Sequence, residues 1–109
     1  MSINTEFREF VLDQLKGLGA FETRNMFGGT AILKEGVAFA KIKHGSLWLK
    51  ADEQTVGEFS DLGMKQYTYG KDNSRKLNFY ETPAEVLEDS NMLIQWATKA
   101  CEAANRSRK

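Results

Sequence analysis

The sequence predicts an α+β fold in which helices lie on one face of an antiparallel sheet. Three observations carry this prediction: helical apolar spacing at both ends of the chain, strand-like stretches between them, and glycine-containing breaks between consecutive strands. The predicted order of elements is helix–three strands–helix–two strands–helix. Strands joined by tight turns are expected to pair in antiparallel fashion.

The first predicted helix covers residues 5–18, where apolar residues recur at helical spacing and glycines mark the end. Its apolar positions are Phe7, Phe10, Val11, Leu15 and Leu18. Three strands follow, separated by short breaks that contain Gly36 and Gly45. These strands are predicted at 30–34, 37–43 and 47–51.

The apolar pattern of these strands places hydrophobic side chains on both faces of the sheet. Trp48 points away from its neighbours Leu47 and Leu49, and Phe39 alternates with Ala38 and Ala40. Two explanations remain open. Either the terminal helices wrap both sides of the sheet, or a second subunit or protein partner covers the apolar residues of the outer side.

The second half of the chain begins with a short predicted helix at 52–61, for which Asp52 is the expected cap. Two strands at 66–69 and 76–80 then enclose the polar loop GKDNSRK and form a hairpin. Tyr80, at the end of the second strand, is a further apolar residue whose facing the local pattern leaves open.

The clearest local signal for a helix start is the stretch TPAE. Thr82 is the expected N-cap, Pro83 suits the first helical position, and Glu85 completes a capping box. Residues 89–91 are expected to interrupt this helix and to cap a longer one that runs to about residue 104. Residues 105–109 are predicted to be a frayed tail.

Length and composition indicate one folded domain over residues 1–109, with 41% hydrophobic and 28% charged residues. Lysine plus arginine total 15, as do aspartate plus glutamate, and this balance argues against bulk attraction to nucleic acid or anionic lipid. A single cysteine excludes an internal disulfide. No signal peptide or membrane-spanning run is visible, so a cytoplasmic location is expected.

Catalytic and metal-binding residues are sparse, and no cofactor or metal site is predicted. His44 lies in an expected turn without ligand-like neighbours, and Cys101 lies in the alanine-rich last helix without a local base. Glu85 and Glu88 belong to an acidic group whose position early in a helix is favoured by electrostatics alone. An enzyme that uses Cys101 with His44 or with these acids is the least favoured hypothesis.

Basic and aromatic residues are interleaved in the central strands and the second hairpin, a pattern typical of nucleic-acid contact. A solvated hairpin with strand lysines that discourage edge pairing is the alternative explanation. The candidate contact residues are Lys41, Lys43, Lys65, Tyr67, Tyr69, Lys71, Arg75 and Lys76.

The stretch RNMFGG at 24–29 has glycines beside a basic residue, as phosphate-binding loops do. A phosphate loop, however, leads into a helix, and here the apolar run TAIL leads into a strand. Gly28 and Gly29 are therefore expected to kink the chain or to permit close backbone approach. Arg24 is interpreted as part of the lead-in, and Met26 with Phe27 as a core anchor.

Several stretches in this order together resemble the TfoX N-terminal domain family. They are RNMFGG at 24–29, VAFA at 37–40, LWLKAD at 47–52, Phe59, GM at 63–64, YTYG at 67–70, YETPAEVL at 80–87 and WA at 96–97. The resemblance extends over roughly residues 10–104. It implies that Arg24, Met26, Phe27, Gly28, Gly29 and Trp96 are structural motif residues.

The resemblance also implies a two-layer fold like that of secretion chaperones, which are often dimeric. Longer members of the family are regulators of natural competence that act on transcription alongside the cAMP receptor protein and carry a second domain absent from this sequence. The expected function is a small non-enzymatic regulatory or interaction domain that works through protein contacts, with itself or another protein. Direct nucleic-acid binding is the alternative.

Overall fold

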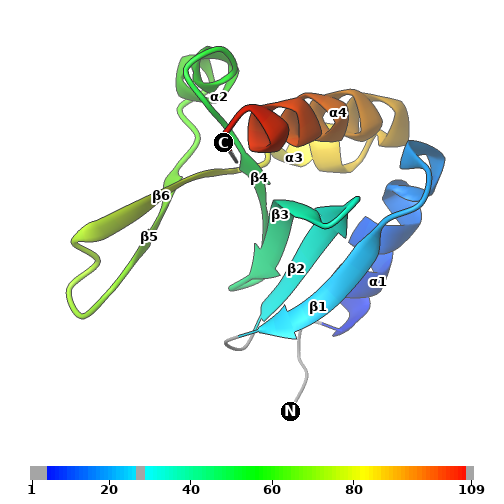
Figure 1. The fold of residues 1–109 in the computed structure, drawn as a ribbon, viewed down its shortest axis with the longest axis horizontal. Coiled ribbons are helices and arrows are strands. Elements are labelled where there is room, and N and C mark those ends of the chain that lie inside the picture. Colours follow the sequence, from blue (N-terminus) through cyan, green and yellow to red (C-terminus); the bar gives the residue numbers. More distant parts are fainter. Residues whose placement is uncertain (1–4, 27–28, 108–109) are drawn as a thin grey trace.

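A computed structural model of the protein describes residues 5–26 and 29–107. It contains a six-stranded antiparallel sheet with helices packed on one face, which confirms the α+β class (Figure 1). The elements are α1 (Thr5–Gln14), η1 (Lys16–Leu18), β1 (Glu22–Met26), β2 (Gly29–Lys34), β3 (Val37–Lys43), β4 (Ser46–Lys50), α2 (Val56–Asp61), β5 (Gln66–Tyr69), β6 (Arg75–Glu81), α3 (Ala84–Leu87) and α4 (Ser90–Ser107). None of the described helices is both long and apolar enough to cross a lipid bilayer.

The predicted order of elements lacked one strand. Residues 22–26 form β1, which pairs antiparallel with β2 from Glu22 opposite Leu33 to Met26 opposite Gly29. The strand escaped prediction because its sequence, ETRNM, has no apolar alternation. It lies at the edge of the sheet and is held by backbone hydrogen bonds to β2, which need no particular side chains.

The strand order is β1-β2-β3-β4-β6-β5, so β4 pairs with β6 rather than with the strand that follows it in sequence. Figure 1 shows the β5–β6 hairpin extending away from the layer that β1, β2 and β3 form with the helices. A bulge in β3 makes Phe39 the extra residue, because Ile32 lies opposite Ala40 and Leu33 opposite Ala38. This bulge turns Phe39 toward the helices, which the simple alternation does not predict.

The main hydrophobic core lies between the sheet and the helices α1 and α4. Phe59 of α2 stacks on Tyr80 with ring centroids 5.4 Å apart and meets Trp96 of α4 edge-on at 5.1 Å. Tyr80 and Phe39 therefore face the helices rather than a partner. The fully buried large side chains of this core are Val11, Leu15, Ile32, Phe39, Leu47, Leu49, Val86 and Leu93.

The first helix is shorter than predicted, and two residues predicted to cap helices in the second half, Asp52 and Thr82, are not the N-caps of those helices. α1 ends at Gln14, and the 3-10 turn Lys16–Leu18 continues it. α2 starts at Val56 with Thr55 as its N-cap, and Asp52 instead closes the preceding turn by accepting a hydrogen bond from the Gln54 N–H at 3.0 Å.

Thr82 is not the cap of α3, whose N-cap residue is Pro83. The Thr82 N–H donates to the Leu47 carbonyl at 2.9 Å, because this residue extends the β4–β6 pairing, and the side chain is buried at 4% exposure. The predicted interruption before the last helix is confirmed: α4 begins at Ser90, and the Asp89 carboxylate accepts the Met92 N–H at 3.1 Å.

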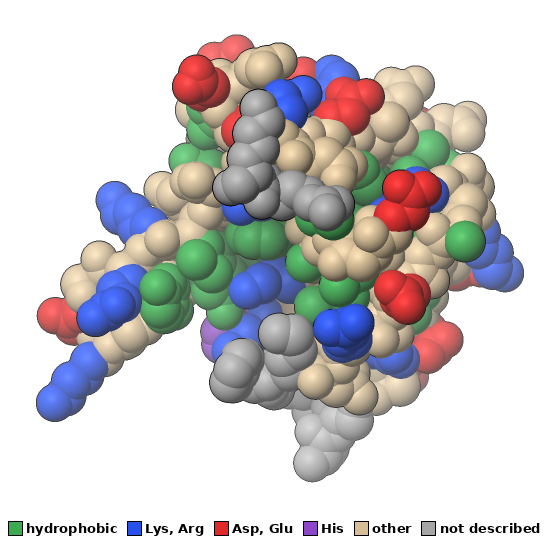
Figure 2. Space-filling model, in the orientation of Figure 1, with side chains coloured by type: hydrophobic (Ala, Val, Ile, Leu, Met, Phe, Trp, Pro, Cys, Tyr) green, Lys and Arg blue, Asp and Glu red, His purple; other side chains and the backbone are tan. Residues whose placement is uncertain are grey.

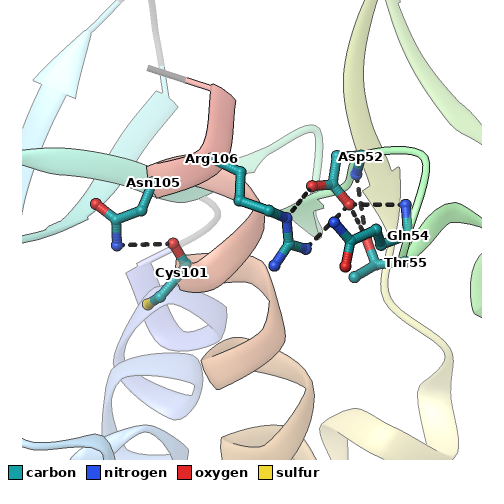
Figure 3. Close-up of polar contacts among 6 residues, drawn as sticks. All are labelled: Asp52, Gln54, Thr55, Cys101, Asn105 and Arg106. Atoms are coloured by element: carbon teal, nitrogen blue, oxygen red, sulfur yellow. Dashed lines mark hydrogen bonds and ion pairs between the residues drawn. The ribbon is translucent and has the colours of Figure 1, made fainter. Parts of the chain in front are cut away.

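The last helix continues beyond the predicted limit, so residues 105–107 are helical rather than frayed. Arg106 reaches from α4 to Asp52, with Nε 2.6 Å from Oδ2 and Nη2 3.1 Å from Oδ1 (Figure 3). These hydrogen bonds from the guanidinium lower the pKa of Asp52 below its ordinary value. The ion pair ties the end of α4 to the turn between β4 and α2.

Candidate binding face of the sheet

A row of side chains crosses the sheet on the face away from the helices. Arg24, Ala31, Lys41 and Trp48 lie directly opposite one another across β1, β2, β3 and β4. Directly opposed residues point to the same face of a sheet, and Trp48 belongs to a cluster separate from the main core. We call this face, which also carries Lys43, Lys50, Phe79 and Tyr67, the outer face.

Three aromatic residues form a small second core on the outer face. Trp48, Tyr67 and Phe79, which we call the outer aromatic cluster, are only 6%, 5% and 9% exposed. The rings of Trp48 and Tyr67 meet edge-on at 5.1 Å, and the Trp48 Nε1–H donates to the Lys43 carbonyl at 3.1 Å. The cluster joins the projecting hairpin to the central strands.

Lysine side chains lie over this aromatic cluster. The Lys41 Nζ atom is 4.6 Å from the centroid of Tyr67 and 5.1 Å from that of Phe79, and the Lys50 Nζ atom is 5.2 Å from Phe79. These distances allow cation–π attraction, and both lysines are partly buried. The outer face is therefore an aromatic layer under a layer of positive charge.

The positive charge of this layer is not neutralised from within the described part of the chain, where Lys41, Lys43 and Lys50 form no ion pair. Burial lowers the pKa of Lys41, and the charges of Lys43 and Lys50 lower it further. The nearest acid by register, Glu81 opposite Trp48, accepts a hydrogen bond from Ser46 at 2.8 Å.

A hollow of about 70 Å³ opens on the outer face, where the hairpin approaches β2 and β3. Figure 2 shows hydrophobic and basic side chains together in the angle between the projecting hairpin and the body of the molecule. The hollow is lined by Gly29, Thr30, Ala31, Lys41, Ile42, Lys43 and Tyr67. It combines an apolar floor with two ammonium groups at its rim.

Comparison with known proteins gives the context for this site. Residues 13–104 match the family model described as the TfoX N-terminal domain. The chain belongs to the TfoX N-terminal domain family. A curated relative, the DNA transformation protein TfoX1 of Aliivibrio fischeri, is 22% identical over 116 residues, an alignment that covers 98% of this chain and 56% of that protein. The chain thus spans about half the length of that curated relative.

The structure of this TfoX N-terminal domain brings together only part of the predicted nucleic-acid contacts. Lys41, Lys43 and Tyr67 meet at the hollow, although the Tyr67 ring is buried. Tyr69 lies opposite Arg75 farther along the hairpin, on the side that Leu77 and Phe79 share by alternation. Tyr69 is 41% exposed.

The other basic candidates lie elsewhere on the TfoX N-terminal domain. Lys76 pairs with Thr68, on the opposite side of the hairpin from Arg75. Lys71 lies exposed in the turn between β5 and β6, and Lys65 lies exposed before β5. These three lysines therefore do not join the hollow.

Lys50 and Phe79 are outer-face residues that the candidate set did not include. The position of Lys50 on the outer face could have been predicted from the sequence, because Lys50 follows Trp48 by two positions in the same strand and must share its face. The position of Phe79 could not, because its place beside Trp48 depends on the pairing of β4 with β6.

The motif of the TfoX N-terminal domain shapes the edge of the sheet. A Cβ atom on Gly29 would lie 2.7 Å from the Ile42 carbonyl oxygen, so the predicted close approach of two backbones is confirmed at this glycine. Arg24 stands at the β1 end of the outer-face row, and Trp96 packs against Phe59 in the main core. Met26 pairs with Gly29, and Phe27 and Gly28 lie outside the described residues.

Cys101 and His44 are not brought together. Burial raises the pKa of the Cys101 thiol to about 11. The charges of Lys34 and Glu35, at the turn between β2 and β3, make smaller contributions to this pKa, which places Cys101 near that turn. His44 lies beyond the opposite end of β3, a strand of seven residues, which corresponds to about 20 Å.

Asp89, which follows Glu85 and Glu88 in the acidic group, is also remote from the thiol. Asp89 precedes α4, and the rise of the helix between it and Cys101 amounts to about 18 Å. Among residues 5–26 and 29–107, no three His, Cys, Asp or Glu side chains lie close enough to hold a metal ion.

Proposed function

We propose that this chain is a non-enzymatic regulatory domain of TfoX type that acts in DNA transformation competence, and on the transcription connected with it, through protein contacts. The assignment to DNA transformation competence is supported by the family of the chain and by the name of the relative from Aliivibrio fischeri. The observation that carries the proposed mode of action is the outer face. This face has a hollow and unpaired lysines, and no described helix contributes to its aromatic cluster.

The chemistry of the outer face suits binding better than catalysis. Its titratable groups around the hollow are Lys41, Lys43 and the buried Tyr67, which supply charge and shape. A nucleophile with a general base and an orienting group is the usual requirement for covalent catalysis. Cys101, the one thiol of the chain, lies on α4 with a raised pKa and is therefore a poor nucleophile at neutral pH.

The test is to delete the gene that encodes this protein from its bacterium and to measure the transformation frequency and the transcript levels of DNA-uptake genes. We expect the deletion to lower both, and wild-type protein or Cys101→Ala to restore them. The double variant Lys41→Met/Lys43→Met should fold but fail to restore either readout. Equal transformation and equal transcript levels with and without the gene would refute the proposed function.

A second candidate function is direct nucleic-acid binding. The observation in its favour is that strand register places Lys41, Lys43, Tyr69 and Arg75 on one side of the sheet and hairpin. Labelled duplex and single-stranded oligonucleotides should then bind at low salt, and binding should weaken steeply as salt is added. The absence of any anisotropy change at low salt would eliminate this candidate.

A further inference from the structure

We propose that the outer face docks an acidic polypeptide segment of a partner protein. Carboxylates of the segment pair with Lys41, Lys43 and Lys50, and a small apolar side chain enters the hollow beside Tyr67. This inference rests on the proposed function, since it specifies the chemistry of the protein contact. It is carried by charge complementarity, by the shape and lining of the hollow, and by the burial of the outer aromatic cluster.

Charge complementarity is the first step. Lys41 and Lys50 lie over the aromatic cluster, and the pKa of Lys41 is lowered by burial and by the charges of its neighbours Lys43 and Lys50. The ammonium group of Lys41 is therefore less stabilised in the free protein than that of a lysine in open water. A carboxylate placed among these ammonium groups removes that repulsion, and its attraction is stronger beside the partly desolvated Lys41 than in open water.

The size of the hollow determines which apolar side chain of the segment it can hold. Its volume of about 70 Å³ corresponds to roughly two water molecules at ~30 Å³ each. Ala31 and Tyr67 give it apolar walls, Ile42 lines it with its backbone because its side chain is buried in the main core, and Gly29 presents no side chain. A side chain of alanine or valine size fits this space, whereas an aromatic ring does not.

The length of the segment follows from the sheet. Three strand spacings of about 4.8 Å separate Arg24 from Trp48, a distance of about 14 Å across the face. An extended chain covers this distance with four to five residues at ~3.3 Å each. A short stretch of alternating acidic and small apolar residues therefore spans the face.

Nucleic acid fits the same surface less well. Single strands bind by stacking bases on exposed aromatic rings, but Trp48, Tyr67 and Phe79 are at most 9% exposed. A formal net charge of zero provides little long-range attraction for a phosphate backbone. Carboxylates beside an apolar side chain match the lysine rim and apolar hollow directly.

The direct test uses the full chain and a fluorescein-labelled peptide of alternating glutamate and valine, about nine residues long, as the probe. Its partner probe carries glutamine in place of every glutamate and has the same length and apolar content. We expect saturable binding of the glutamate peptide, at least about tenfold tighter than the glutamine peptide, because several partly desolvated charge pairs are lost. Amide shifts in the 15N-labelled protein should concentrate at 29–31, 41–43 and 67.

Two variants of equal charge change locate the contact. Lys41→Met removes the charge at the hollow but keeps an unbranched stem over Tyr67, so the fold is retained. Lys76→Met removes an exposed charge from the other side of the same hairpin. We expect Lys41→Met to weaken peptide binding by about tenfold and Lys76→Met to change it less than twofold, with circular dichroism and thermal unfolding confirming both folds.

The inference is overturned if glutamate and glutamine peptides bind alike, if neither binds at millimolar concentration, or if Lys76→Met weakens binding as much as Lys41→Met. It is also overturned if a nine-nucleotide single strand or a short duplex binds more tightly than the glutamate peptide and depends on Lys41. The proposed function has its separate test in the deletion. A clear competence phenotype with no peptide binding rejects the docking chemistry alone.

Discussion

Replacing Gly29 with alanine is expected to destabilise the protein, because this glycine lies against the backbone of the neighbouring strand. The added Cβ atom would be 2.7 Å from the Ile42 carbonyl oxygen and 3.3 Å from the Lys43 Cβ atom. A backbone oxygen within a sheet cannot rotate away, so β2 and β3 must move apart locally. Overpacking of this kind lowers the free energy of unfolding by about 1–3 kcal/mol.

Gly57→Ala is the matched control for this change. Gly57 lies in α2, and nothing lies within 4 Å of the position that its Cβ atom would occupy. The same one-carbon addition should raise the free energy of unfolding by about 0.5–1 kcal/mol, because alanine loses less backbone entropy than glycine in a helix. The two variants should therefore change stability in opposite directions.

Urea unfolding, followed by circular dichroism and by tryptophan fluorescence, measures both changes. The expected loss for Gly29→Ala corresponds to a drop in the melting temperature of roughly 5–15 °C for a domain of this size. Unfolding of Gly29→Ala at the same urea midpoint as wild type, with an unchanged slope, would refute the close packing of β2 against β3. A loss of equal size in Gly57→Ala would show that the effect is not specific to the sheet.

Three further predictions address the outer face, the ion pair and the thiol. Trp48→Ala should lower the free energy of unfolding by about 3–5 kcal/mol in urea titrations followed by circular dichroism, because the ring is buried in the outer aromatic cluster; a loss below about 1 kcal/mol would contradict that burial. The Asp52→Asn variant should be less stable than wild type at neutral pH. Arg106 lowers the pKa of Asp52 in the folded protein, so the charged carboxylate stabilises the fold at pH values above the pKa that Asp52 has in the unfolded chain. That difference should vanish as the pH falls through the folded pKa, and unfolding titrations that show a constant difference down to about pH 2 would count against the ion pair. Alkylation of Cys101 by iodoacetamide should still accelerate above pH 9.5, since the pKa of the thiol is raised to about 11 by burial; a plateau near pH 9 would contradict this.

Local patterns in the sequence predicted most of the elements. The apolar spacing around Val11 and Leu15 predicted α1. The breaks at Gly36 and Gly45 correctly predicted where β2, β3 and β4 are separated. Such signals work because helices and hairpins are determined by residues that are close in sequence. The capping box at Thr82 failed for a long-range reason, since pairing of its N–H with Leu47 holds that residue in the sheet.

The candidate site could be predicted only in part. Lys41, Lys43 and Tyr67 were chosen for their chemistry, and they line the hollow. The nucleic-acid alternative needs exposed aromatic rings for stacking, whereas the tertiary structure buries Tyr67 under Lys41. Exposure of a side chain depends on what packs over it, and that information is spread over strands far apart in the chain.

The sequence by itself determined the α+β class, the hairpins, the last helix and membership of the TfoX N-terminal domain family, which is shown by the match over residues 13–104. The tertiary structure alone decided that β4 pairs with β6, that a bulge turns Phe39 inward, and that Phe79 joins Trp48 beneath a row of lysines. The physical reason is the separation in sequence between the residues that make the contacts. Helices and turns form from contacts within a few residues, whereas the face on which a strand residue lies follows from its register with a distant strand.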